Sequence, residues 1–172
     1  MRLTQKQVIG TKFEMWLEDY FKSHDFRQVR RNVEFHRSRN LYRQADLIFS
    51  MIVNNRIEMY LVEAKYSSCG PITYKFRQDY KEKAGSNRLT NLVDEIIERQ
   101  NFIGAYRSIL VTNKYFDETL KQEATRRNII LLDRDRLLAN YKDRKQNYNS
   151  LEKDILTIDI YNRNLNKSII QM

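Results

Sequence analysis

The stretch DLIFSMIVNNRIEMYLVEAK, which begins at Asp46, constrains the fold of this chain more than any other segment. Two apolar runs, 45–53 and 57–64, flank the dipeptide Asn54-Asn55. Asparagine tolerates the positive φ angles that a two-residue hairpin turn requires. The segment therefore predicts an antiparallel β-hairpin with the two asparagines at its tip.

The register of this hairpin brings charged residues together. With a two-residue turn Val53 faces Arg56, and counting outward from the turn places Asp46 opposite Glu63. Facing residues in an antiparallel pair hold their Cβ atoms about 4.5–5.5 Å apart on the same face of the sheet. Lys65 follows Glu63 by two positions and shares that face. The sequence thus predicts two carboxylates and one ammonium group in a single cluster.

The chemistry of such a cluster favours a metal site. Two carboxylates at this spacing repel one another, which raises a pKa or recruits a cation. Oxygen ligands without a nearby histidine or thiolate favour Mg²⁺ or Mn²⁺ over zinc, and the Ala64 carbonyl offers a further oxygen. Lys65 could then orient the attacking water in metal-assisted phosphodiester hydrolysis. Spacing alone is also compatible with a cross-strand charge cluster on the surface, so both interpretations stay open at this point.

The remainder of the chain predicts helices and strands in alternation. The form TQKQ is typical of a capping box and predicts a first helix from about Thr4 to Ser23. A strand is expected at 26–37, before the hairpin. After it we expect helices at 90–105 and 117–127, strands at 108–113 and 128–133, a final helix near Asp133 or Asp135, and a tail strand at 154–163. This order favours an α/β fold with a mixed central sheet.

Composition limits the class of protein and its partners. The 172 residues suit one domain, the net charge is +9 and the sequence pI is about 9.6. This charge favours phosphate-bearing partners, although a generic basic protein is the alternative. A single cysteine excludes a disulfide framework within the chain. No apolar run reaches the roughly 18 residues of a membrane span, so a cytoplasmic protein is expected.

Two basic segments are candidates for nucleic-acid binding. One leads into Asp46, and the other, 67–88, interleaves basic with aromatic residues in what we expect to be a long loop. Such mixing suits contact with a phosphate backbone and stacking on bases, while a flexible basic surface loop is the alternative. The candidate contacts are Arg37, Arg39, Arg43, Lys75, Arg77, Lys81 and Lys83.

The segments ADLIF and VEAK, with sixteen residues between Asp46 and Glu63, resemble a known signature. It is the D-x(n)-(D/E)-x-K pattern of the restriction-endonuclease-like, or PD-(D/E)xK, nuclease superfamily. Ala45 stands where many members have proline. GTKFEMWLEDYF resembles the first helix of that superfamily, with Glu14 at the matching position. NFIGAYRSILVTNKYFDETLKQEATRRNIILLDRDRLL resembles the later half of its methylation-dependent restriction enzyme and Holliday junction resolvase-like branch.

The resemblance covers about residues 5–140 and implies a fold and an activity. The implied fold is an αβββαβ core with a mixed sheet flanked by helices, in one nuclease domain followed by an extension at 141–172. The implied activity is Mg²⁺- or Mn²⁺-dependent endonucleolytic cleavage of DNA by a homodimer. A Holliday junction resolvase, an RNA-cleaving member and a catalytically silent nucleic-acid-binding subunit remain alternatives.

The resemblance also implies a role for each residue of the site. Asp46, Glu63 and the Ala64 carbonyl would bind the metal, and Lys65 would position the attacking water. Glu14, from the first helix, would assist through a bound water or a second metal. It implies no recognition sequence.

Overall fold

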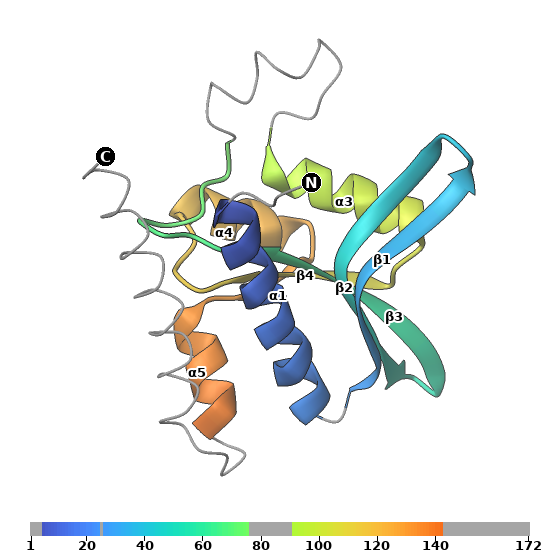
Figure 1. Cartoon of the computed structure of the whole chain (residues 1–172), viewed down its shortest axis with the longest axis horizontal. Helices are drawn as coiled ribbons and strands as arrows, with labels where there is room; N and C mark the ends of the chain where they lie inside the picture. Colours follow the sequence, from blue (N-terminus) through green and yellow to red (C-terminus); the bar gives the residue numbers. More distant parts are fainter. Residues whose placement is uncertain (1–4, 25, 76–90, 143–172) are drawn as a thin grey trace.

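A five-stranded mixed sheet runs through the computed structural model, which describes residues 5–24, 26–75 and 91–142 (Figure 1). The strands are β1 (Arg27–Ser38), β2 (Leu41–Val53), β3 (Arg56–Lys65), β4 (Arg107–Thr112) and β5 (Ile130–Leu132). They lie in sequence order, with β1, β2 and β3 antiparallel and β3, β4 and β5 parallel. The predicted mixed sheet is confirmed.

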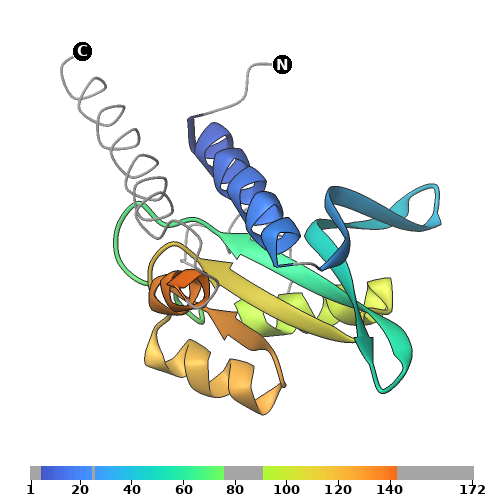
Figure 2. The ribbon, with the colours of Figure 1, turned by 90° about the horizontal axis from the view of Figure 1, so that it is seen from below.

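Helices cover both faces of this sheet. They are α1 (Gln5–Ser23), α3 (Leu92–Ile103), α4 (Glu118–Arg126) and α5 (Arg134–Lys142). Residues from α1 and α5 share one buried cluster with β2, β3 and β4, whereas α3 and α4 share a second cluster with Leu110 of β4. Figure 2 shows α1 on one side of the sheet, with α3 and α4 on the other. The molecule is therefore a three-layer α/β/α sandwich.

The β2–β3 hairpin forms in the predicted register. Asn54 and Asn55 have φ angles of 49° and 60°, which is the left-handed conformation that asparagine tolerates in this kind of turn. The ladder runs from Val53–Arg56 to Leu47–Val62. The next positions outward are Asp46 and Glu63, so both acids lie at the open end of the hairpin.

β2 begins at Leu41, four residues earlier than the apolar run 45–53 predicts. Its polar first residues stay extended because β1 pairs with them, as in Phe35–Arg43 and His36–Tyr42. β1 lies at the edge of the sheet. Its ladder with β2 is irregular near both ends, and Gln28 and Asn32 have positive φ angles.

α3 supplies the crossover that the parallel pair β3–β4 requires. Asn91 caps its N-terminus by accepting a hydrogen bond from the Asp94 amide, and Gly104 ends it in the left-handed conformation at φ 76°. Buried Leu92, Val93 and Ile96 hold the helix against the sheet. The later turns of α3 also contact the sheet, since Glu98 accepts a hydrogen bond from Arg43 of β2 at 2.7 Å.

The other predicted elements also form, with bounds that differ by a few residues. The expected tail strand, and the part of the predicted basic loop from 76 to 88, lie outside the described residues. None of the helices in the described ranges combines the length and the apolar composition needed to cross a bilayer.

Leu47, fully buried between the sheet and α1, should carry much of the stability of the hairpin. We expect Leu47→Ala to reduce the free energy of unfolding by about 2–5 kcal/mol, because the deletion leaves a cavity that the sheet cannot close. Ile52→Ala, on the same strand but 55% exposed, is the matched control and should cost less than about 1 kcal/mol. Urea unfolding followed by circular dichroism measures both; equal losses would contradict this account of the core.

Candidate active site

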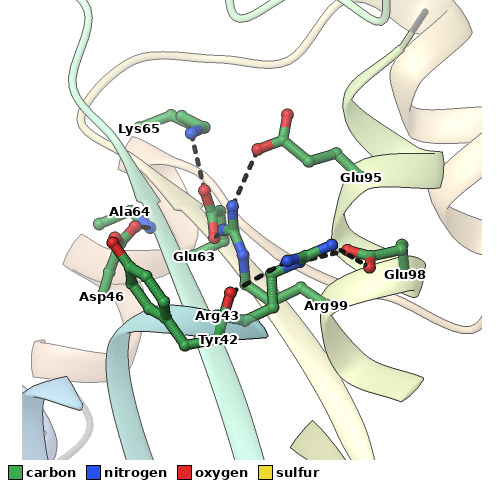
Figure 3. A network of polar contacts seen from close by, with 9 residues as sticks. All are labelled: Tyr42, Arg43, Asp46, Glu63, Ala64, Lys65, Glu95, Glu98 and Arg99. Atoms are coloured by element: carbon green, nitrogen blue, oxygen red, sulfur yellow. Dashed lines mark hydrogen bonds and ion pairs between the residues drawn. The ribbon is translucent and has the colours of Figure 1, made fainter. Parts of the chain in front are cut away.

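Glu63, near the end of β3, is a buried carboxylate with a cation on each oxygen. Its exposure is 2%, and Lys65 Nζ donates a hydrogen bond to Oε1 at 2.7 Å. Arg99 Nη1, from α3, forms an ion pair with Oε2. Figure 3 shows the two cations approaching Glu63 from different elements. A charge this deeply buried is tolerated because it is paired and hydrogen-bonded.

Asp46 lies across the hairpin from Glu63, as the register predicted. The Ala64 amide donates a hydrogen bond to Asp46 Oδ2 at 2.8 Å and so holds the aspartate beside β3 (Figure 3). Burial, with the charge of Glu63 added, raises the pKa of Asp46 to about 7. Near neutral pH this carboxyl group is therefore close to half ionised.

Glu63 and Lys65 each shift the pKa of the other toward the charged form. Burial on its own would raise the pKa of Glu63, but the Lys65 ammonium and the Arg99 guanidinium hold it below its ordinary value. Burial on its own would lower the pKa of Lys65, but Glu63, with help from Asp46, holds it above its ordinary value. At neutral pH Glu63 is ionised and Lys65 is protonated.

Glu14 on α1 faces the same region and is also tied to β1. Arg31 Nη1 approaches Glu14 Oε2 at 3.8 Å, and Arg31 Nε donates to Glu18 Oε2 at 3.4 Å. Burial raises the pKa of Glu14 against the opposing effect of Arg31, and the charges of Glu63 and Lys65 also act on it. The structure thus places Glu14 within electrostatic reach of the β3 residues, from the opposite layer to α3.

Arg99 is the site residue that the sequence did not reveal. Besides Glu63 it contacts Glu95, with Nη2 donating to Oε1 at 2.9 Å. In the sequence, Glu95 and Arg99 form an ordinary i,i+4 pair, which is typical of a solvated helix surface. Only the packing of α3 on the sheet shows that the arginine reaches a residue 36 positions earlier.

Arg37 and Arg43, two of the predicted nucleic-acid contacts, are bound to the C-terminal half of α3. Arg43 donates to both carboxylate oxygens of Glu98, at 3.0 and 2.7 Å, and Arg37 donates to the Phe102 carbonyl at 3.1 Å. Both guanidinium groups stack on the Phe102 ring, at 4.4 and 5.0 Å from its centre. These arginines anchor the β1–β2 hairpin to the helix.

Arg39 and Lys75 are exposed, as contacts with a large anionic partner require. Arg39 lies in the turn between β1 and β2. Lys75 forms an isolated antiparallel bridge with Asn91, the residue that directly precedes α3. The remaining predicted contacts, Arg77, Lys81 and Lys83, lie outside the described residues.

The donor set fits a hard divalent cation. Asp46 Oδ1 has no hydrogen-bond donor among the described residues, and Glu63 and the Ala64 carbonyl lie next to it along β3. Within those residues no group of three or more histidines, cysteines or acids is positioned to hold a metal. Mg²⁺ commonly uses one or two carboxylates and completes its shell with water, so two acids suffice. Burial and the neighbouring charge of Glu63 raise the pKa of Asp46, so a cation held between the two acids would stabilise the ionised form of Asp46.

The mixed sheet, with Asp46, Glu63 and Lys65 at the open end of its β2–β3 hairpin, is consistent with a restriction-endonuclease-like fold. The family model described as Mrr_cat, restriction endonuclease, matches residues 6–140. The chain therefore belongs to this restriction endonuclease family, and its enzymatic class is that of a nuclease.

Two solved structures show the same fold. A protein of unknown function, AF1548, superposes with a TM-score of 0.54 at 15% identity, over 88% of this chain and 79% of its own. The DNA modification-dependent restriction endonuclease AspBHI superposes with a TM-score of 0.53 at 15% identity, over 94% of this chain. This chain spans 41% of the length of AspBHI. No curated protein matches the sequence.

Asp46 should destabilise the metal-free protein at neutral and alkaline pH. Its native pKa of about 7 lies above the ordinary 3.8, so the native state binds the proton more tightly and stability falls as pH rises between these values. In EDTA, Asp46→Asn should match the wild-type protein near pH 4 and exceed its stability by roughly 2–4 kcal/mol at pH 8. Thermal unfolding across this pH range measures the difference.

Asp19→Asn, at an exposed position of α1, is the control. It measures the effect on stability of removing one negative charge from a protein whose net charge is +9. If Asp46→Asn were less stable than the wild-type protein at pH 8, the surroundings would stabilise the ionised aspartate. That result would contradict a pKa raised by burial and by Glu63.

Proposed function

We propose that this protein is a Mg²⁺- or Mn²⁺-dependent endonuclease that hydrolyses phosphodiester bonds in DNA. The single observation that carries the proposal is the cluster at the end of the β2–β3 hairpin. There the Ala64 amide holds Asp46 beside Glu63, and Lys65 bonds to Glu63 on the same strand. Membership of the restriction endonuclease family supports hydrolysis, and the DNA substrate of AspBHI supports DNA as the target.

Asp46, Glu63 and the Ala64 carbonyl would hold the metal. When bound, the metal would supply Lewis-acid stabilisation of charge on the phosphate. Lys65 is protonated at neutral pH, so it acts as a hydrogen-bond donor that orients the attacking water and neutralises charge, and not as the base. Glu14 would contribute a further carboxylate from α1, through a bound water.

Positive charge would hold the substrate across this end of the sheet. The chain carries a net charge of +9, and the exposed Arg39 and Lys75 are the described residues proposed to contact phosphates. Arg77, Lys81 and Lys83 belong to the same proposal. Arg37 and Arg43 would act less directly, by fixing the β1–β2 hairpin on α3. Two copies of the chain would present two such sites, one for each strand of a duplex.

Nicking of supercoiled plasmid tests the activity. With Mg²⁺ or Mn²⁺ the wild-type protein should nick the plasmid, and EDTA should abolish nicking. Asp46→Ala and Lys65→Ala should lower the rate by about 10²-fold or more, since each removes electrostatic stabilisation of the transition state. Lys121→Ala, which removes a lysine from the surface of α4, is the control and should retain the rate.

A protein that binds the plasmid but leaves it intact with every divalent metal would refute the proposal. Linear duplex, four-way junction, single-stranded DNA and RNA, compared in one experiment, identify the preferred substrate. Preference for the junction would identify a resolvase, and preference for RNA would replace DNA in the proposal.

Salt dependence tests the phosphate contacts. In EDTA, affinity for a DNA duplex should fall linearly on a log–log plot against salt concentration, because bound phosphates release counterions. Arg39→Ala and Lys75→Ala should each reduce the slope by about 1 if each residue contacts one phosphate. Arg126→Ala, at an exposed pair on α4, removes an equal charge and should leave the slope unchanged. A slope that neither variant alters would remove both residues from the interface.

A further inference from the structure

Arg99 is bound to Glu63, one of the two carboxylates that the proposed metal would need. Its Nη1 forms an ion pair with Glu63 Oε2, while Lys65 takes Oε1. Both oxygens of the glutamate are therefore already bound by cations of the chain itself. Figure 3 shows Arg99 reaching Glu63 from the α3 side, and Asp46 lying on the side of Ala64.

Three features of Arg99 indicate that this contact can be exchanged. Its side chain is 16% exposed, so it lies at the margin of the site and not in the core. Its Nε is buried without a hydrogen-bond partner among the described residues, so Glu63 and Glu95 leave one donor unsatisfied. Glu95 already receives Nη2 at 2.9 Å and is one-third exposed. A guanidinium that leaves Glu63 therefore keeps a partner one helical turn away.

Electrostatics makes Arg99 and a divalent cation competitors. The guanidinium neutralises part of the charge of Glu63, which lowers the attraction of the site for any other cation. It also places a positive charge on the carboxylate that a cation bound to Asp46 and Glu63 would share. The field of Arg99 extends to Asp46 as well, since Asp46 acts on the pKa of Arg99.

We propose that Arg99 gates the metal site by competing with the divalent cation for Glu63, and that its existing bond to Glu95 retains it when it releases Glu63. The inference rests on the proposed function in that the same two acids hold the metal. Arg99 is a positioning residue here: it acts on Glu63 and touches neither substrate nor metal. In this arrangement the site takes up metal when Arg99 releases Glu63 and keeps its bond to Glu95, which links metal affinity to the state of one side chain on α3.

The test is Mn²⁺ binding by the full chain without DNA, followed by the paramagnetic resonance signal of free Mn²⁺. Arg99→Ala should bind Mn²⁺ about tenfold more tightly than the wild-type protein, within the range of typical coupling between competing ligands. Arg99→Gln, which keeps hydrogen-bond donors but no charge, should change affinity in the same direction. Asp46→Asn should weaken binding in every background, which locates the ion at this site.

Two further variants separate gating from general effects. Arg127→Ala removes a guanidinium that pairs with Asp94 elsewhere on α3 and should leave Mn²⁺ affinity unchanged. Glu95→Gln should weaken Mn²⁺ binding about threefold in the wild-type protein and have no effect in Arg99→Ala, because Glu95 acts through the arginine. Glu95 is partly exposed, so this variant reports on the gate even if Arg99→Ala fails to fold.

Equal or weaker Mn²⁺ binding by Arg99→Ala and Arg99→Gln would overturn the gate, and so would the absence of Mn²⁺ binding by all variants. The two proposals can fail separately. Tighter binding in the Arg99 variants with no nicking by any protein would support the gate and refute the nuclease. Metal-dependent nicking with unchanged Mn²⁺ affinity in the Arg99 variants would support the nuclease and refute the gate.

Discussion

The hydrogen bond from the Ala64 amide to Asp46 is the contact on which the site depends. It joins a carboxylate of β2 to the backbone of β3, next to Glu63, and it forms only in one hairpin register. That register is set by the two-residue turn at Asn54 and Asn55, whose left-handed φ angles fix the pairing. A change of one residue in the turn would send one acid to the other face of the sheet. The chemistry at one end of the hairpin is thus decided about eight residues away, at its tip.

The sequence predicted the hairpin because both strands and the turn that sets their register lie within one short segment, residues 45–65. Short apolar runs and a two-residue turn define both the strands and the facing pair Asp46 and Glu63. The position of Arg99 is not local information. It depends on the rotation of α3 about its own axis, which is set by the burial of Leu92, Val93 and Ile96 against the second core cluster. The sequence contains those residues, but no pattern within the helix indicates which strand residue its polar side will meet.

Net charge does not say which partners individual basic side chains have within the chain. A net charge of +9 predicts anionic partners, and the basic run before Asp46 suggested direct contacts with DNA. In the structure α3 carries Glu95 and Glu98, and each receives an arginine at 2.9 Å or closer. Net charge does not distinguish a cation bound to an acid of the same chain from an exposed one such as Arg39. Arg43 and Arg99 are thus bound to acids of α3, while Arg39 is exposed, and contact of any of the predicted residues with nucleic acid stays a prediction.

The irregular edge of the sheet has a consequence for how copies of the chain can associate. β1 is the outermost strand beside β2, and an edge strand normally offers its backbone to a further strand. Here the ladder is interrupted between Arg27 and Arg30, and Gln28 and Asn32 turn the backbone into the left-handed region. A strand of a second copy that paired with β1 would meet an irregular backbone. It would also bring Arg27, Arg30 and Arg31 of the two copies close together. Pairing of two copies through β1 is therefore disfavoured, and the proposed homodimer would join through another surface.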